Sequence, residues 1–141
     1  MNNGITLKTQ FTINAPLPKV WEALTNPDLI RQYFFGTNLE TSWKPGDPIF
    51  WRGVWEGVAY EDKGTVLEFE PQKRLKYNYW SSFSGTPDVP ENYADITYEV
   101  EAVNGATLLT ITQEGLESED RKEHSENNWK GMMAEMEKML Q

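Results

Sequence analysis

Arg52 and Glu56 are the residues of this sequence whose types and spacing best suit recognition of a polar group. On a continuous strand, residues four apart share a face, so the guanidinium and the carboxylate would project together. If that face turned inward, the pair would fix the polar end of a ligand inside an apolar pocket. If it turned outward, the two would form a surface ion pair of little energetic value. The outward arrangement is favoured, because Trp51 and Trp55 on the opposite face have more apolar area to bury.

Four further side chains invite a functional interpretation. Tyr79 and Trp80 occupy opposite faces of one predicted strand, and either ring packs in the core or contacts a ligand. A hydroxyl of Tyr79 that faced a cavity could orient a polar ligand atom. Gln113 closes an otherwise apolar strand face, either because the strand leaves the core there or because the amide serves a pocket. His124, the single histidine, lies among polar residues and is predicted to face solvent.

Several classes of chemistry are excluded by what the sequence lacks. The absence of cysteine excludes disulfides, thiolate metal sites and cysteine nucleophiles. No phosphate-binding glycine motif or zinc-protease motif occurs, and the carboxylates lack the spacing of a calcium loop. Ser118 and Ser125 have no plausible activating partners. We therefore expect no metal, no cofactor and no catalytic residue; acid-base catalysis by Arg52, Glu56 or Tyr79 is the weaker alternative to simple binding.

Composition and charge limit the partners and the location. The net charge of -9 argues against a nucleic acid or an anionic membrane, since both need a basic surface. No apolar run approaches the length of a membrane span, and the first residues lack a signal pattern, so a cytoplasmic protein is expected. A chain of 141 residues without a linker predicts one domain over residues 1–141. The oligomeric state is not predicted.

The order of elements follows from periodicity and from proline and glycine positions. Residues 5–13 alternate between apolar and polar, which is typical of a half-buried antiparallel strand. Prolines bracket a short helix over residues 16–25, and a second short helix is expected over 28–35. Strands are then predicted at 39–43, 48–60, 64–70 and 74–82, with turns at 44–47, 61–64 and 71–73.

The last third of the sequence is the best defined. Asn104-Gly105 predicts a two-residue hairpin turn, which pairs Tyr98 with Ile111 and places the intervening apolar residues on one face. Residues 119–140 predict one long helix with Ser118 as its N-cap. Its polar first half is expected to lie outside the core, and its apolar stripe lies in the second half. That stripe comprises Trp129, Met132, Met133, Met136, Met139 and Leu140.

The long predicted loop over residues 81–92 could act as a lid, with Phe83 and Val89 pressing into a pocket mouth. The methionines of the last helix suit either a core or an adaptable pocket wall. The candidate ligand-binding residues are Arg52, Glu56, Tyr79, Trp80, Phe83, Tyr98, Gln113, Trp129, Met133 and Met136.

Three motifs, in this order, carry a family resemblance. They are Ala15-Pro16-x-x-x-Val20-Trp21-x-Ala23-Leu24-Thr25-x-Pro27, Gly64-x-Val66-x-Glu68-x-x-Pro71-x-x-x-Leu75, and Gly105-x-Thr107-x-Leu109-Thr110-Ile111-Thr112-Gln113-Glu114-Gly115, followed by the Trp129 helix. The chain resembles the START and birch-pollen-allergen (SRPBCC) superfamily, and within it the single-domain bacterial activator of heat-shock-protein-90 ATPase homologue family. It departs from many relatives at Tyr33-Phe34-Phe35, where they have tryptophan, and at Gln113, where they often have histidine.

The resemblance implies an α+β helix-grip fold: a curved antiparallel sheet wrapped round a long C-terminal helix, with two short helices after the first strand. It also implies an apolar cavity between sheet and helix, and in eukaryotic relatives with an additional N-terminal domain a chaperone-binding surface. The function expected is non-catalytic binding of a small apolar or aromatic ligand. The alternatives are a chaperone-interaction module and, more weakly, a cyclase-like or hydrolase-like enzyme.

Overall fold

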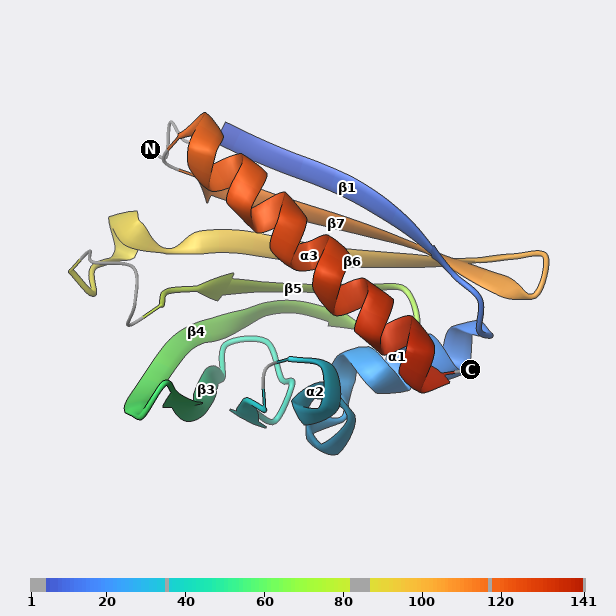
Figure 1. Ribbon diagram of the computed structural model, residues 1–141, viewed down its shortest axis with the longest axis horizontal. Helices are drawn as coiled ribbons and strands as arrows, with labels where there is room; N and C mark the ends of the chain where they lie inside the picture. Colours follow the sequence, from blue (N-terminus) through green and yellow to red (C-terminus); the bar gives the residue numbers. More distant parts are fainter. Residues whose placement is uncertain (1–4, 35, 82–86, 117, 141) are drawn as a thin grey trace.

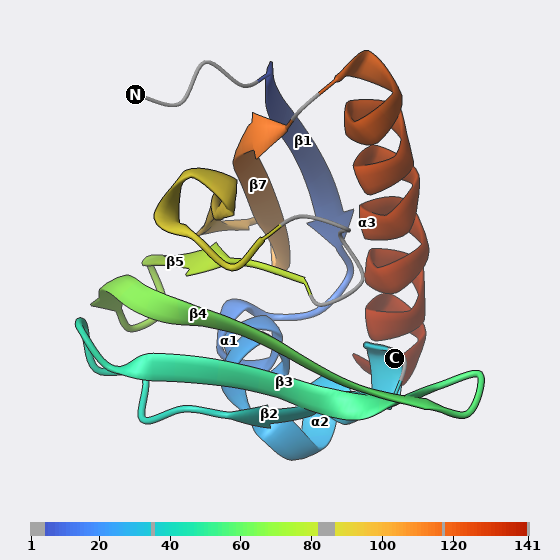
Figure 2. The same cartoon turned by 90° about the vertical axis from the view of Figure 1, so that its left-hand side faces the viewer.

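A single curved antiparallel sheet and one long helix dominate the computed structural model, which describes residues 5–34, 36–81, 87–116 and 118–140. The seven strands lie in the order β1-β7-β6-β5-β4-β3-β2, and α3 crosses the concave face (Figures 1 and 2). The predicted helix-grip fold is therefore confirmed. The elements are β1 (Ile5–Ile13), α1 (Leu17–Thr25), α2 (Pro27–Tyr33), β2 (Asn38–Glu40), β3 (Pro48–Trp55), β4 (Val58–Glu70), β5 (Arg74–Tyr79), η1 (Pro90–Asn92), β6 (Ala94–Val103), β7 (Ala106–Leu116) and α3 (Glu119–Leu140).

The two short helices close one end of the sheet, as Figure 2 shows. Proline occupies the first turn of both, where its missing N–H costs no hydrogen bond. The Asn26 side chain caps α2 by accepting from the amide of Asp28 at 2.9 Å. α1 buries Val20, Trp21 and Leu24, which are the apolar face that its spacing predicted. α2 ends at Tyr33, earlier than predicted from the sequence.

The predicted β6–β7 hairpin is confirmed in turn and register. Asn104 and Gly105 both have positive φ, 51° and 82°, as a two-residue hairpin turn requires. Tyr98 pairs with Ile111, and Ile96 pairs with Gln113. This register turns Ile96, Tyr98 and Ile111 into the concave face, where all three are buried.

The predicted turn at residues 61–64 is wrong. The chain reverses instead at Glu56 and Gly57, whose φ values are 50° and 80°, and β4 then runs without a break from Val58 to Glu70. Gly64 lies within that strand, where a Cβ atom would stand 1.8 Å from the carbonyl oxygen of Asn78. The glycine is therefore needed for close strand approach rather than for a turn. One consequence is that Asp62 becomes a strand residue that faces inward.

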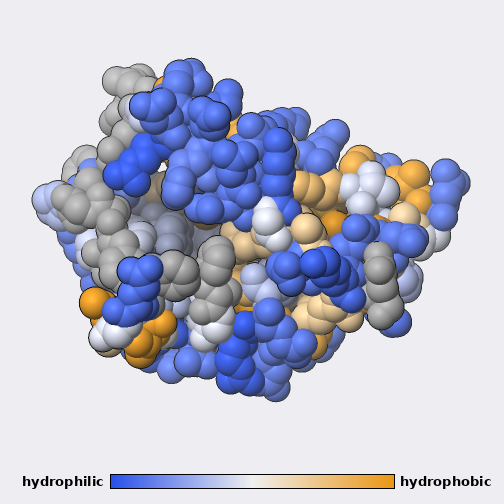
Figure 3. Space-filling model, viewed as in Figure 1, coloured by the Kyte–Doolittle hydropathy of each residue, from blue (hydrophilic) through white to orange (hydrophobic). Residues whose placement is uncertain are grey.

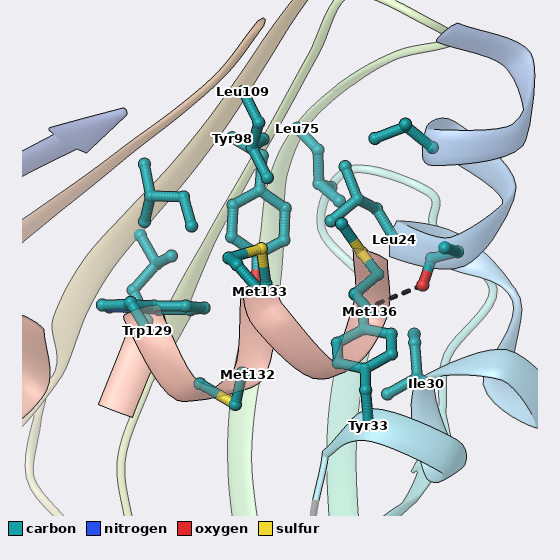
Figure 4. Packing of buried hydrophobic residues seen from close by; sticks show 14 of the residues in the cluster. Leu24, Ile30, Tyr33, Leu75, Tyr98, Leu109, Trp129, Met132, Met133 and Met136 are labelled. Carbon is teal, nitrogen blue, oxygen red and sulfur yellow. Dashed lines mark hydrogen bonds between the residues drawn. The ribbon is translucent and has the colours of Figure 1, made fainter. Parts of the chain in front are cut away.

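The C-terminal half of α3 fills the concave face of the sheet. Met133 and Met136 are buried, and Figure 4 shows Met133 pointing toward Tyr98 and Met136 lying between Leu24 and Tyr33. The Tyr33 hydroxyl donates to the Ala23 carbonyl at 2.8 Å, which satisfies a buried polar group. Ser118 caps the helix by accepting from the Arg121 amide, as predicted. Within the described residues, no helix is long and apolar enough to cross a membrane.

Candidate functional site

A cavity of about 670 Å³ lies under the N-terminal half of α3, and of the methionines that the structure describes only Met132 borders it. Its walls come from β3, β4, β5, β6 and the end of β7 on the sheet side, and from α3 on the other. In Figure 3 the surface is hollowed beside the hydrophilic residues that cover the start of α3. The helix therefore has two roles along its length: up to Met132 it borders an open space, and from Met133 onward it closes the core.

Aromatic rings dominate the sheet wall of the cavity. Trp51 on β3 is central, since its ring centroid lies 5.3 Å from that of Tyr77 and 5.0 Å from that of Tyr79. Tyr98 extends the aromatic cluster behind the wall to Trp129, with ring centroids 5.8 Å apart. Such rings bury large apolar areas and offer flat faces to a ligand. The aromatic residues that line the cavity are Phe34, Trp51, Tyr60, Tyr77, Tyr79, Trp80 and Trp129.

Asp62 is the one acidic side chain on the described part of this wall, and it is only 6% exposed. The alternation of β4 turns it inward, directly across the ladder from Trp51. The Tyr79 hydroxyl donates to its Oδ2 at 2.7 Å. Burial, and then the neighbouring Asp62 carboxylate, raise the pKa of Tyr79 well above its ordinary value, so this phenol stays protonated as a donor.

A second pair of polar groups joins the helix to the sheet. The indole Nε1 of Trp129 donates to the Gln113 Oε1 at 3.0 Å. Both residues line the cavity, so the amide at the end of the apolar face of β7 forms a hydrogen bond in the cavity wall. Behind it, the hydroxyls of Tyr77 and Tyr98 are 2.9 Å apart, and burial raises the pKa of both phenols. All these groups are neutral donors and acceptors at physiological pH.

The helix wall is polar, as the sequence predicted, but the sequence did not indicate that this part of α3 would line a cavity. Arg121, His124, Ser125 and Asn128 line the cavity from the first half of α3. This half was expected to lie outside the core, and it does, but it faces the cavity mouth rather than bulk solvent alone. His124 remains exposed, in agreement with its predicted solvent contact.

Four of the ten predicted ligand-binding residues line the cavity: Tyr79, Trp80, Gln113 and Trp129. Three others, Tyr98, Met133 and Met136, are buried in the core behind it. Phe83 lies outside the described residues. Val89, its predicted partner in a lid, is exposed and does not line the cavity.

The remaining two candidates, Arg52 and Glu56, lie away from the cavity. The Arg52 side chain is directed outward, 40% exposed, and forms ion pairs with Glu40 and Glu61 at 2.7 Å each. Glu56 is exposed in the β3–β4 turn, so the two residues do not share a strand face. The inward arrangement considered for this pair is therefore wrong, because Trp51 on the opposite face takes the buried position.

Asp62 and Tyr60 are cavity residues that sequence reasoning missed. The prediction of a turn at 61–64 removed Asp62 from any strand face, so its inward direction could not be considered. Once β4 is continuous, the alternation from Asp62 through Gly64 to Val66 marks one buried face. A carboxylate on such a face would have been the signal, since buried aspartates are rare.

Among the described residues, no group of three or more histidine, aspartate or glutamate side chains is placed to hold a metal ion. The cavity combines an aromatic wall, a buried carboxylate with its phenol donor, and a polar rim. Pockets that bind small molecules share this design, with mostly apolar walls and a few placed polar groups.

Comparison with solved structures gives the same fold over nearly the whole chain. The solution structure of ChR145 from Cytophaga hutchinsonii is 43% identical, with a TM-score of 0.84 over 96% of this chain and 93% of that one. The crystal structure of MLL2253 from Mesorhizobium loti is 21% identical, with a TM-score of 0.78 over 96% of each chain. That of Ara h 8.0201 is 12% identical, with a TM-score of 0.79 over 98% of each. No protein with curated function matches significantly.

The family profile described as "Activator of Hsp90 ATPase homolog 1-like protein" matches residues 14–141. This span contains all the elements that line the cavity and all three motifs on which the resemblance rested. Together with the relative from Cytophaga hutchinsonii, it shows that the chain belongs to this family.

Proposed function

We propose that the protein binds a small aromatic or apolar molecule, without chemical conversion, in the cavity between the sheet and the first half of α3. The observation that carries the proposal is the cavity itself, about 670 Å³ in volume with an aromatic sheet wall. Known small-molecule sites commonly have volumes of about 300–1,000 Å³. An aromatic ligand would be held mainly by the area that it buries against rings such as Trp51.

The placement of polar groups supports binding rather than acid-base catalysis. Arg52 and Glu56, two of the three residues considered for catalysis, lie outside the cavity. The third, Tyr79, stays protonated because burial raises its pKa, so it serves as a hydrogen-bond donor. We keep the expected cytoplasmic location and the single domain of 141 residues as part of this proposal.

The proposal is tested by native mass spectrometry and tryptophan-fluorescence titration with fatty acids, sterols and aromatic polyketides. Trp51, Trp80 and Trp129 all line the cavity, so a ligand bound there should change the emission. A matched pair of variants on α3 locates the effect. Ser125→Trp puts an indole into the cavity and should abolish binding, whereas Asn127→Trp, at an exposed position outside the cavity, should not. Failure of every ligand class to bind the native protein contradicts the proposal.

Contact with Hsp90 is the second function to consider, because the description of the family names it. Such contact would use the outer surface. Stimulation of the cognate chaperone's ATPase would support it, and it should survive Ser125→Trp, since that change only fills the cavity. The same pair of variants therefore separates the two functions.

A further inference from the structure

Asp62 is an acidic residue on the buried concave face of the sheet, where the side chains around it are apolar. Its neighbours on the concave face, Ile49, Trp51 and Val66, are all buried. Placing a carboxylate among them is unfavourable unless its charge is compensated by polar or cationic groups. Its position in the cavity wall places the carboxylate within reach of a bound molecule.

The surroundings of Asp62 suit a cation in particular. Trp51 stands across the ladder, and Tyr79 holds the carboxylate through its hydroxyl at 2.7 Å. Trp80 and Tyr60 also line this part of the sheet wall. Aromatic faces attract cations through the negative potential above the ring, and a nearby carboxylate adds a charge-assisted hydrogen bond. An anion would meet repulsion from the same groups.

Apart from the tyrosines of the sheet wall, the other charged and titratable lining groups that the structure describes lie on the helix wall. Arg121 and His124 belong to the first turns of α3, and both are exposed. Exposed charges are screened by water and salt, so they influence a ligand much less than a buried carboxylate does. The two walls therefore differ: a buried carboxylate among rings on the sheet, and a solvated arginine among polar side chains on the helix.

We propose that the ligand is an aromatic compound bearing a protonated amine, and that Asp62 accepts a hydrogen bond from this amine while Trp51 and Tyr79 contact it with their rings. This inference rests on the proposed function and adds to it the chemical class of the ligand. It also gives the ligand a direction, with the ammonium end toward the sheet and the remainder toward α3.

The test uses three probes that share one ring system and differ in charge: anthracenylmethylamine, anthracenylmethanol and anthracenecarboxylate. Each is titrated into the native protein at neutral pH, with tryptophan emission as the readout. We expect the amine to bind about tenfold or more tighter than the alcohol, and the carboxylate to bind weakest. Asp62→Asn keeps the size of the side chain and an acceptor for Tyr79, and it should reduce the preference for the amine to about twofold or less. Glu101→Gln removes the same charge from an exposed site on β6 and should leave the preference unchanged.

The outcomes separate this inference from the proposed function. If the alcohol or the carboxylate binds the native protein as tightly as the amine, the inference is overturned while binding in the cavity stands. This comparison needs no variant, so it decides the matter even if Asp62→Asn does not fold. If none of the three probes binds but a member of the wider ligand panel does, the inference alone is overturned. If nothing binds, both are overturned.

Discussion

Two methionines four residues apart on α3 should respond very differently to the same substitution. Met136 is fully buried among core residues, whereas Met132, although also buried, lines the cavity. Met136→Ala removes packed atoms and leaves a void, which for methionine costs about 2–5 kcal/mol in the free energy of unfolding. Met132→Ala removes atoms that already face open space on one side, so we expect a loss of only about 1 kcal/mol.

Urea and thermal denaturation, both followed by circular dichroism, give the free energy of unfolding and the melting temperature of each variant and of the native protein. A loss near 3 kcal/mol for Met136→Ala should lower the melting temperature by roughly 10 °C for a chain of this size. Met132→Ala should lower it by about a third as much, but it should alter the affinity for the anthracene probes. Met136→Ala should leave that affinity within about twofold, because the residue lies outside the cavity. Equal losses of stability, or a larger loss for Met132→Ala, would refute the division of α3 into a part that borders the cavity up to Met132 and a part that packs in the core from Met133 onward.

Three other predictions concern the sheet and its surface. Gly64→Ala should destabilise the protein by about 3 kcal/mol in urea denaturation, because the added Cβ meets the backbone of Asn78. Gly131→Ala on α3 is the control: it has open space around it and should stabilise by about 0.5–1 kcal/mol. A small loss of stability for Gly64→Ala would contradict the close strand contact. Burial raises the pKa of Tyr77 and Tyr79, so the unfolded chain loses these phenolic protons at a lower pH than the folded protein does. The free energy of unfolding should therefore fall once the pH exceeds about 10. An ultraviolet titration in which these phenols ionise near pH 10 while the protein stays folded would contradict this prediction. Arg52→Ala should leave both the urea midpoint and the probe affinity almost unchanged, because its ion pairs are exposed to solvent. Any loss of binding would show that these ion pairs matter to the cavity.

The β6–β7 hairpin and α3 were predicted from local sequence signals, because those signals agree with the tertiary structure. Asn104-Gly105 has one favourable turn geometry, and that turn fixes the register of β6 and β7. The long helix was likewise predicted from its cap and its apolar stripe. The structure has the predicted pairing in the hairpin, and α3 has the predicted bounds and the predicted cap at Ser118.

The sequence prediction failed at Gly64, where a contact with a neighbouring strand, and not a turn, requires the glycine. Gly64 follows acidic and basic residues and resembles a turn glycine, yet it is required by the close approach of Asn78 on the neighbouring strand. That contact joins residues fourteen apart and cannot be seen in a local pattern. The error displaced the turn from Glu56-Gly57 and concealed the inward direction of Asp62.

The candidate site was predicted only in part, because several of its residues reach the cavity through tertiary packing that the sequence does not reveal. Trp129 and Gln113 were identified because they stand out on amphipathic elements, and their hydrogen bond joins helix to sheet. Which methionines fill the core and which border a space depends on how far α3 tilts across the sheet, as Figure 1 shows, and periodicity alone carries no such information. The polar residues of the first half of α3 gain their place at the cavity only through that tilt.

The most direct test of the central claim is to locate a bound ligand by the indole N–H resonances of the tryptophans. Trp51, Trp80 and Trp129 line the cavity, whereas Trp21 and Trp43 pack against Phe69 at another site and do not. In a two-dimensional NMR titration with the tightest-binding anthracene probe, the three cavity resonances should shift together and saturate at one affinity. The resonances of Trp21 and Trp43 should stay in place. Shifts confined to those two, or no shift at any indole, would contradict binding in the cavity.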